Sequence, residues 1–228
     1  MYLPRLCLLI VLWPILSHAQ EGHKVTCRFL CVEGAVPPPP LVNVSAKGEE
    51  LTCSVPADTI SAPVVCFAKG ESISFLTASE LKPAAIATLP ANTTAAILVF
   101  APAQKAPDAL PWKISVMEDF SANAADGGAL LVNFCTQDVR LSIADTTVTL
   151  QSGKAQRLAR PEKLDAFNMA AAVFQFQQDD VWRTASESML RFVPGMRYLI
   201  YAYLDPVTGR PRFCTLQDFP PAKIHPSK

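Results

Sequence analysis

Apolar residues recur mostly at every second position along this chain, which is the pattern of a β-strand with one buried face. Helical spacing competes in one segment, where Phe167, Ala170 and Phe174 also share a helical face. We interpret this segment as a strand through Phe174 and Phe176. The other clear strand segments are residues 25–32, 73–76, 97–100, 112–116, 139–143, 148–150 and 198–204.

Short polar turns join several of these segments. Residues 144–146, Ala-Asp-Thr, separate two of them, and residues 205–209, Asp-Pro-Val-Thr-Gly, follow a third. The pair Asp179-Asp180 lies before a further expected strand, residues 182–190. Turns as short as these connect antiparallel neighbours. The sequence therefore predicts an all-β protein, an antiparallel β-sandwich made of two sandwich domains in tandem.

An Ala/Pro-rich stretch, residues 101–111, divides the chain into two halves. It lacks apolar periodicity, and each half has the size of a small sandwich domain. A single larger sandwich that uses this stretch as a crossover is the alternative. The predicted organisation is a signal peptide at 1–19, a first β domain at 20–101, a linker at 102–111, a second β domain at 112–220 and a C-terminal tail at 221–228.

Residues 1–19 have the composition of an export signal. Arg5 precedes the apolar run 6–16, and Ser17-His18-Ala19 places small residues at the expected cleavage site. The apolar run contains Pro14 and is too short to cross a bilayer as a helix. We expect a soluble mature protein, periplasmic or secreted, with no membrane span after cleavage of the signal.

The charge balance narrows the choice of partner. The chain has 228 residues, with 20 Lys and Arg against 20 Asp and Glu. It has no basic stripe of the kind that binds phosphate backbones, so we expect no nucleic-acid partner. Half of the residues are hydrophobic, which is enough for a substantial core. The expected partner is a protein or a surface ligand of unknown identity.

Six cysteines remain once Cys7 is removed with the signal. An even number in an exported chain favours disulfides. Cys135 and Cys214 are the only two after the proposed boundary, so we predict that they pair. The alternative is that both are free thiols buried as small apolar side chains. The pairing of the other four is left open: Cys27, Cys31, Cys53 and Cys66.

Histidine supplies most general-base catalysis at neutral pH and many metal ligands, and it is scarce in this chain. The three histidines, His18, His23 and His225, lie close to the expected mature termini or in the signal. We therefore expect no catalytic residue, no metal and no cofactor. The predicted function is that of an exported non-catalytic protein that acts by binding, or by structural association with, a protein or a surface ligand.

Two other functions remain as alternatives. A carboxylate-dependent, glycosidase-like hydrolase would use Asp119, Asp126 or Asp179, provided that two of them converge in a pocket. A copper carrier would use His23, because signal cleavage one residue later would make it the third residue of the mature chain.

Residues 196–204 form the most informative predicted strand, because both of its faces are apolar. In an open antiparallel sheet one face normally meets water, so something must cover the second face. The cover is either the other half of the chain or a ligand or protein partner. Arginine, tyrosine and tryptophan are enriched at binding surfaces. The candidate binding residues are Arg197, Leu199, Tyr201, Tyr203, Trp182 and Arg210.

Overall fold

The computed structural model describes residues 22–103, 109–119 and 127–219, and the expected signal peptide and C-terminal tail lie outside these ranges. Within them the chain forms strands, turns and loops but no helix, and the all-β sandwich prediction is confirmed. It follows that this part of the chain contains no helix long and apolar enough to cross a membrane.

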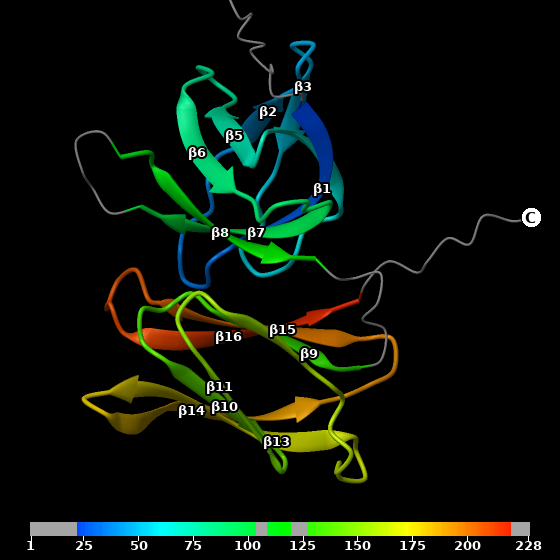
Figure 1. Ribbon diagram of the computed structural model, residues 1–228, viewed down its shortest axis with the longest axis vertical. Coiled ribbons are helices and arrows are strands. Elements are labelled where there is room, and N and C mark those ends of the chain that lie inside the picture. The colour runs from blue at the N-terminus through cyan, green and yellow to red at the C-terminus, as the bar shows by residue number, and fades with distance from the viewer. Residues whose placement is uncertain (1–21, 104–108, 120–126, 220–228) are drawn as a thin grey trace, which may run out of the picture.

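The N-terminal half forms one eight-stranded sheet wrapped around its own core (Figure 1). Its strand order is β3-β2-β5-β4-β1-β7-β8, and β6 pairs with β5. The rings of Phe29, Phe75 and Phe100 meet edge to face inside, with centroids 5.6–6.3 Å apart. The strands are β1 Gly22–Cys31, β2 Leu41–Val44, β3 Glu50–Cys53, β4 Val64–Lys69, β5 Ser72–Thr77, β6 Pro83–Thr88, β7 Ala95–Pro102 and β8 Trp112–Glu118.

The C-terminal half is a sandwich of two four-stranded sheets. One sheet has the order β11-β10-β13-β14 and the other the order β12-β9-β15-β16, and a second core fills the space between them. The strands are β9 Ala129–Asn133, β10 Val139–Ile143, β11 Thr146–Leu150, β12 Ala155–Leu158, β13 Met169–Gln178, β14 Val181–Arg191, β15 Arg197–Leu204 and β16 Pro211–Asp218.

The predicted linker at 102–111 does not separate the two halves. β8 pairs with β7 across this stretch, with Pro102 opposite Trp112, so it joins two neighbouring strands of the N-terminal sheet. The first half therefore extends through β8, and the second begins at β9. The Ala/Pro composition correctly indicated a break between strands, but composition does not distinguish a hairpin loop from a linker between domains.

The strand pattern is confirmed, and most of the strand pairings are antiparallel, as the sequence predicts. β13 runs through Phe174 and Phe176, and Asp179 and Asp180 turn the chain into β14 with positive φ angles of 50° and 58°. Two pairings are parallel, β1 with β7 and β9 with β15. The two halves repeat this arrangement. β7 lies between β1, to which it is parallel, and β8, to which it is antiparallel; β15 lies in the same way between β9 and β16.

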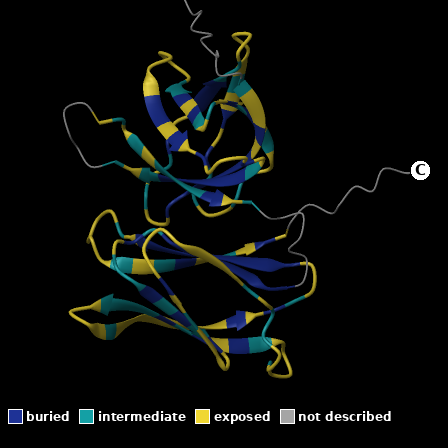
Figure 2. Cartoon of the chain, viewed as in Figure 1, coloured by how far each residue is buried: buried dark blue, intermediate teal, exposed yellow. Residues whose placement is uncertain are grey.

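The two halves share a third core. The β12-β9-β15-β16 sheet faces the core of its own sandwich on one side and the N-terminal sheet on the other (Figures 1 and 2). Leu30, Ile97 and Val99 of the N-terminal sheet pack there against Leu199 and Tyr201 of β15. We call this the middle core; it fixes the halves against each other.

Candidate functional site

The middle core accounts for three of the six predicted binding residues. Leu199 and Tyr201 are fully buried there, and Tyr203 is 5% exposed. The sequence left open whether this face of β15 is covered by the other half of the chain or by a partner. In the structure, the N-terminal half covers it. These three side chains therefore contribute to the association of the halves and offer no free surface to a ligand.

Arg197, the fourth predicted residue, lies at the start of β15 in a buried group of charges at the edge of the middle core. Its Nε donates to Asp218 Oδ2 at 2.8 Å, and its Nη2 donates to Asp119 Oδ1 at 2.7 Å. Arg28 of β1 binds the same carboxylate of Asp218 with both terminal nitrogens, at 2.7 and 2.9 Å. We call Arg28, Asp119, Arg197 and Asp218 the Arg/Asp cluster.

The Arg/Asp cluster is electrically balanced and well hydrogen-bonded. Arg28, Arg197 and Asp218 are each less than 10% exposed. Burial alone would raise the pKa of Asp218, but the hydrogen bonds and positive charges of Arg28 and Arg197 outweigh it and lower that pKa. Burial acts to lower the pKa of Arg28, and its hydrogen bond and ion pair with Asp218 raise it above its ordinary value. Both groups therefore remain charged at neutral pH.

The two remaining candidates lie apart from this cluster. Trp182, near the start of β14, is half-buried under the guanidinium of Arg140, whose central carbon lies 4.4 Å from the ring centroid. Arg210 is exposed in the turn between β15 and β16. The six predicted residues thus do not form one binding surface.

The predicted Cys135–Cys214 disulfide is absent, and both residues are free buried thiols. Cys135 contacts the core of the C-terminal sandwich, whereas Cys214 contacts the middle core, so they lie on opposite sides of the β12-β9-β15-β16 sheet. A bridge through the sheet is geometrically impossible without moving the backbone. Burial raises the pKa of Cys135 to about 12 and that of Cys214 to about 11, which keeps both protonated and unreactive.

Three other buried thiols do lie together. Cys66 is within hydrogen-bonding reach of both Cys27 and Cys53 in the N-terminal core. On refolding in a glutathione redox buffer, two of these thiols can pass two electrons and two protons to glutathione disulfide. We expect mass spectrometry of non-reduced peptides to find Cys66 linked to Cys27 or Cys53. A peptide that links Cys135 to Cys214 would contradict the sheet geometry.

The carboxylates of the alternative hydrolase do not converge in the described residues. Asp119 is held in the Arg/Asp cluster, and Asp126 lies outside the described ranges. Asp179 lies in the β13–β14 turn, at the far end of β14 from the Arg/Asp cluster. The part of β14 near that cluster is at Ser188, nine residues after Asp179, which corresponds to about 30 Å along a strand. Asp119 does lie close to Asp218, but both carboxylates bind arginines, and the lowered pKa of Asp218 is opposite to what a general acid requires.

The copper alternative receives no added ligands from the fold. His23 is exposed on β1, opposite Ala68. In the described part of the chain, no group of three or more His, Cys, Asp or Glu side chains is arranged to hold a metal ion.

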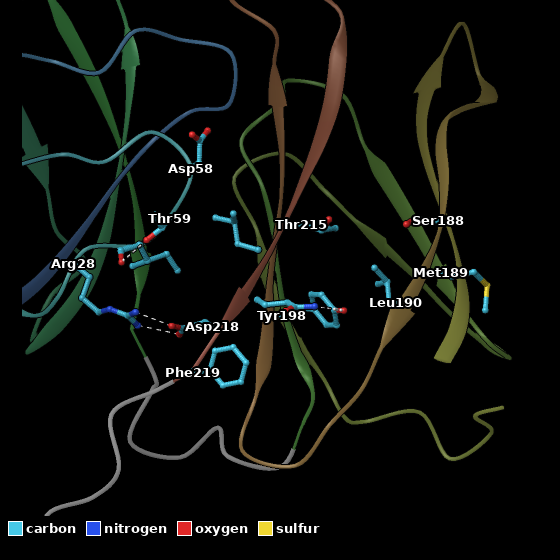
Figure 3. A pocket seen from close by; sticks show the side chains of 13 residues that line it. Arg28, Asp58, Thr59, Ser188, Met189, Leu190, Tyr198, Thr215, Asp218 and Phe219 are labelled. Carbon is cyan, nitrogen blue, oxygen red and sulfur yellow. Dashed lines mark hydrogen bonds and ion pairs between the residues drawn. The ribbon is translucent and has the colours of Figure 1, made fainter. Parts of the chain in front are cut away.

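A groove opens beside the Arg/Asp cluster, where the two halves meet (Figure 3). Its volume is about 650 Å³, within the usual range for ligand sites. Strand β16 runs through it between the loop Asp58–Ile60 of the N-terminal half on one side and the end of β14 on the other. We call it the β16 groove; its lining is Arg28, Asp58–Ile60, Ser188–Leu190, Tyr198 and Thr215–Phe219.

Tyr198 closes one end of the gap between β14 and β16. Its hydroxyl accepts from the backbone N–H of Arg191 at 3.0 Å and donates to the carbonyl of the same residue at 3.2 Å. The side-chain amide of Gln217 donates to it at 3.3 Å. This hydroxyl therefore satisfies the outward backbone groups of β14 at Arg191 and ties the two strands together.

Sequence reasoning missed Arg28, Asp218 and the β16 groove. A signal for the first two was present, because Arg28, Arg197 and Asp218 each lie within or beside an apolar strand segment, where a charged side chain needs a partner.

Comparison with protein-family models and with curated proteins finds no match for this chain.

Proposed function

We propose that this protein is an exported, non-catalytic β-sandwich protein that binds a protein partner in the β16 groove. The observation that carries the proposal is the groove itself, which lies at the junction of two halves fixed by a shared core. Apolar side chains at its rim add contact area: Met189 is 50% exposed and Phe219 is 65% exposed. The expected signal sequence supports a location outside the cytoplasm.

Site-directed photo-cross-linking in the native host tests this proposal. We expect benzoylphenylalanine at Met189 to yield a protein adduct identifiable by mass spectrometry. The same residue at Val181 is the control, because Val181 is on the same strand and is equally exposed, at 50%, but lies outside the groove. Filling the groove with Ser188→Trp should abolish the Met189 adduct. Equal adducts at both positions, or an adduct that survives Ser188→Trp, would contradict the proposal.

A further inference from the structure

The β16 groove contains the free edge of a β-sheet. β16 pairs with β15 on one side and is the last strand of its sheet. Asp205 N–H donates to the carbonyl of Arg210, and this pair continues the β15–β16 ladder, so hydrogen bonding to β15 alternates from there along β16. The even-numbered residues from Arg212 to Asp218 bond to β15. The backbone groups of Phe213, Thr215, Gln217 and Phe219 therefore point away from it.

These outward groups have no partner among the residues that the structure describes. The other side of β15 confirms the alternation. Tyr198 N–H donates to the carbonyl of Gly128, just before β9, and the carbonyl of Ala202 accepts from the N–H of Phe134, just after β9. β14 also presents an outward edge, but Tyr198 satisfies its groups at Arg191. What remains open in the groove is a row of donors and acceptors on β16, spaced to match an extended backbone.

The central part of this edge lacks the features that usually protect a free strand. Natural edges carry charged side chains, prolines or bulges that prevent pairing with another chain. From Phe213 to Gln217, β16 has none of the three. By contrast, β14 carries Arg183, Glu187 and Arg191 along its length.

We propose that the β16 groove binds a single extended segment of the partner protein, which pairs with β16 as an added strand. This inference rests on the proposed function and names its recognition mode, β-strand addition. The main chain of the segment would supply the hydrogen bonds, and its alternate side chains would contact the apolar rim at Ile60, Met189 and Phe219.

The shape of the groove favours one strand over a second copy of this chain. The edge of β16 is recessed between the loop Asp58–Ile60 and Ser188–Leu190 (Figure 3). Edge-to-edge pairing of two sandwiches needs an edge that protrudes, because the neighbouring strands and loops of the second copy must also fit. A lone extended segment meets no such obstacle.

Thr215→Pro is the discriminating variant. The substitution removes the outward N–H of Thr215 and places a ring where a partner strand would lie, but it leaves the bonds to β15 in place. Thr149→Pro is the matched control. Thr149 is exposed on β11, another uncharged edge strand. The Ala144 N–H bonds to Ala171 beside β13, so even-numbered residues of β10 bond to β13 and odd-numbered ones bond to β11. In the β10–β11 register, this leaves the N–H of Thr149 pointing outward.

The probe is a phage-displayed library of linear 12-residue peptides, selected on the full mature chain. We expect selected peptides to bind the wild type and the Thr149→Pro variant equally, and the Thr215→Pro variant at least about tenfold more weakly. Bound peptide should also slow amide exchange at Thr215 and Gln217. Circular dichroism and a denaturant melt would confirm that both variants fold, and Ser188→Trp provides a second block of the groove if Thr215→Pro does not fold.

Equal binding by Thr215→Pro, or bound peptide without slowed exchange at Thr215, would overturn strand addition. A dimer of the wild type that Thr215→Pro converts to a monomer would show that a second copy fills the groove, and would also overturn it. If no linear peptide binds while the Met189 cross-link forms, the inference fails and the proposed function stands. If neither is seen, both fail.

Discussion

Asp218→Asn is expected to lower the free energy of unfolding by about 3–5 kcal/mol, because it leaves two buried arginines with one carboxylate between them. Asp218 is the only residue of the Arg/Asp cluster that takes two hydrogen bonds from Arg28 and one from Arg197. A urea melt that follows near-ultraviolet circular dichroism measures the change. Asp145→Asn is the control: its ion pair with Lys163 is exposed to solvent, so the free energy of unfolding should change little.

The same variant should change the dependence of stability on pH. The pKa of Asp218 is lower in the folded protein than its ordinary value of about 3.9 in the unfolded chain. Its contribution is therefore complete above that ordinary value and is lost as the pH falls through the lower, folded pKa. We expect the wild type to lose stability below about pH 4 more steeply than Asp218→Asn. Parallel acid profiles, or a loss below 1 kcal/mol at neutral pH, would contradict this role.

Tyr201→Ala is expected to cost about 3–5 kcal/mol, because it removes a fully buried ring from the middle core. Tyr201→Phe is the matched variant. The Tyr201 hydroxyl is enclosed near the Cys214 thiol and the backbone of Glu33, but it makes no hydrogen bond of good geometry in the part of the chain that the structure describes. Its removal should leave stability unchanged or raise it by about 1 kcal/mol. If Tyr201→Phe were as damaging as Tyr201→Ala, the ring packing would not be the cause.

The strands could be predicted because their signal is local. Alternation over a few residues reports which face is buried, and the Asp179-Asp180 turn is recognisable from its own residues. The parallel pairs could not be predicted, because no short pattern distinguishes a strand beside a hairpin partner from one beside a distant partner. The same limit explains the misplaced domain boundary.

The site was harder to predict than the fold, for a related reason. The two apolar faces of β15 correctly required a cover, yet the residues that provide it, such as Leu30 and Ile97, come from the other half of the chain. Arg197 was a candidate binding residue because arginine is enriched at binding surfaces. Its role depends on Asp218 and, through it, on Arg28, which lies 190 residues from that aspartate.

The two parallel pairings also determine when each half can form. Thr26 pairs with Ala95 and Ala129 pairs with Tyr198, a separation of 69 residues in each case. β1 and β9 can pair earlier with their antiparallel neighbours, β4 and β12, but each gains its parallel neighbour only when almost all of its half has been synthesised. Contacts this distant place folding in the slow regime of milliseconds to seconds. Until β15 is in place, the N-terminal sheet exposes Leu30, Ile97 and Val99 to water, and apolar surface of this kind makes an incomplete chain prone to aggregation.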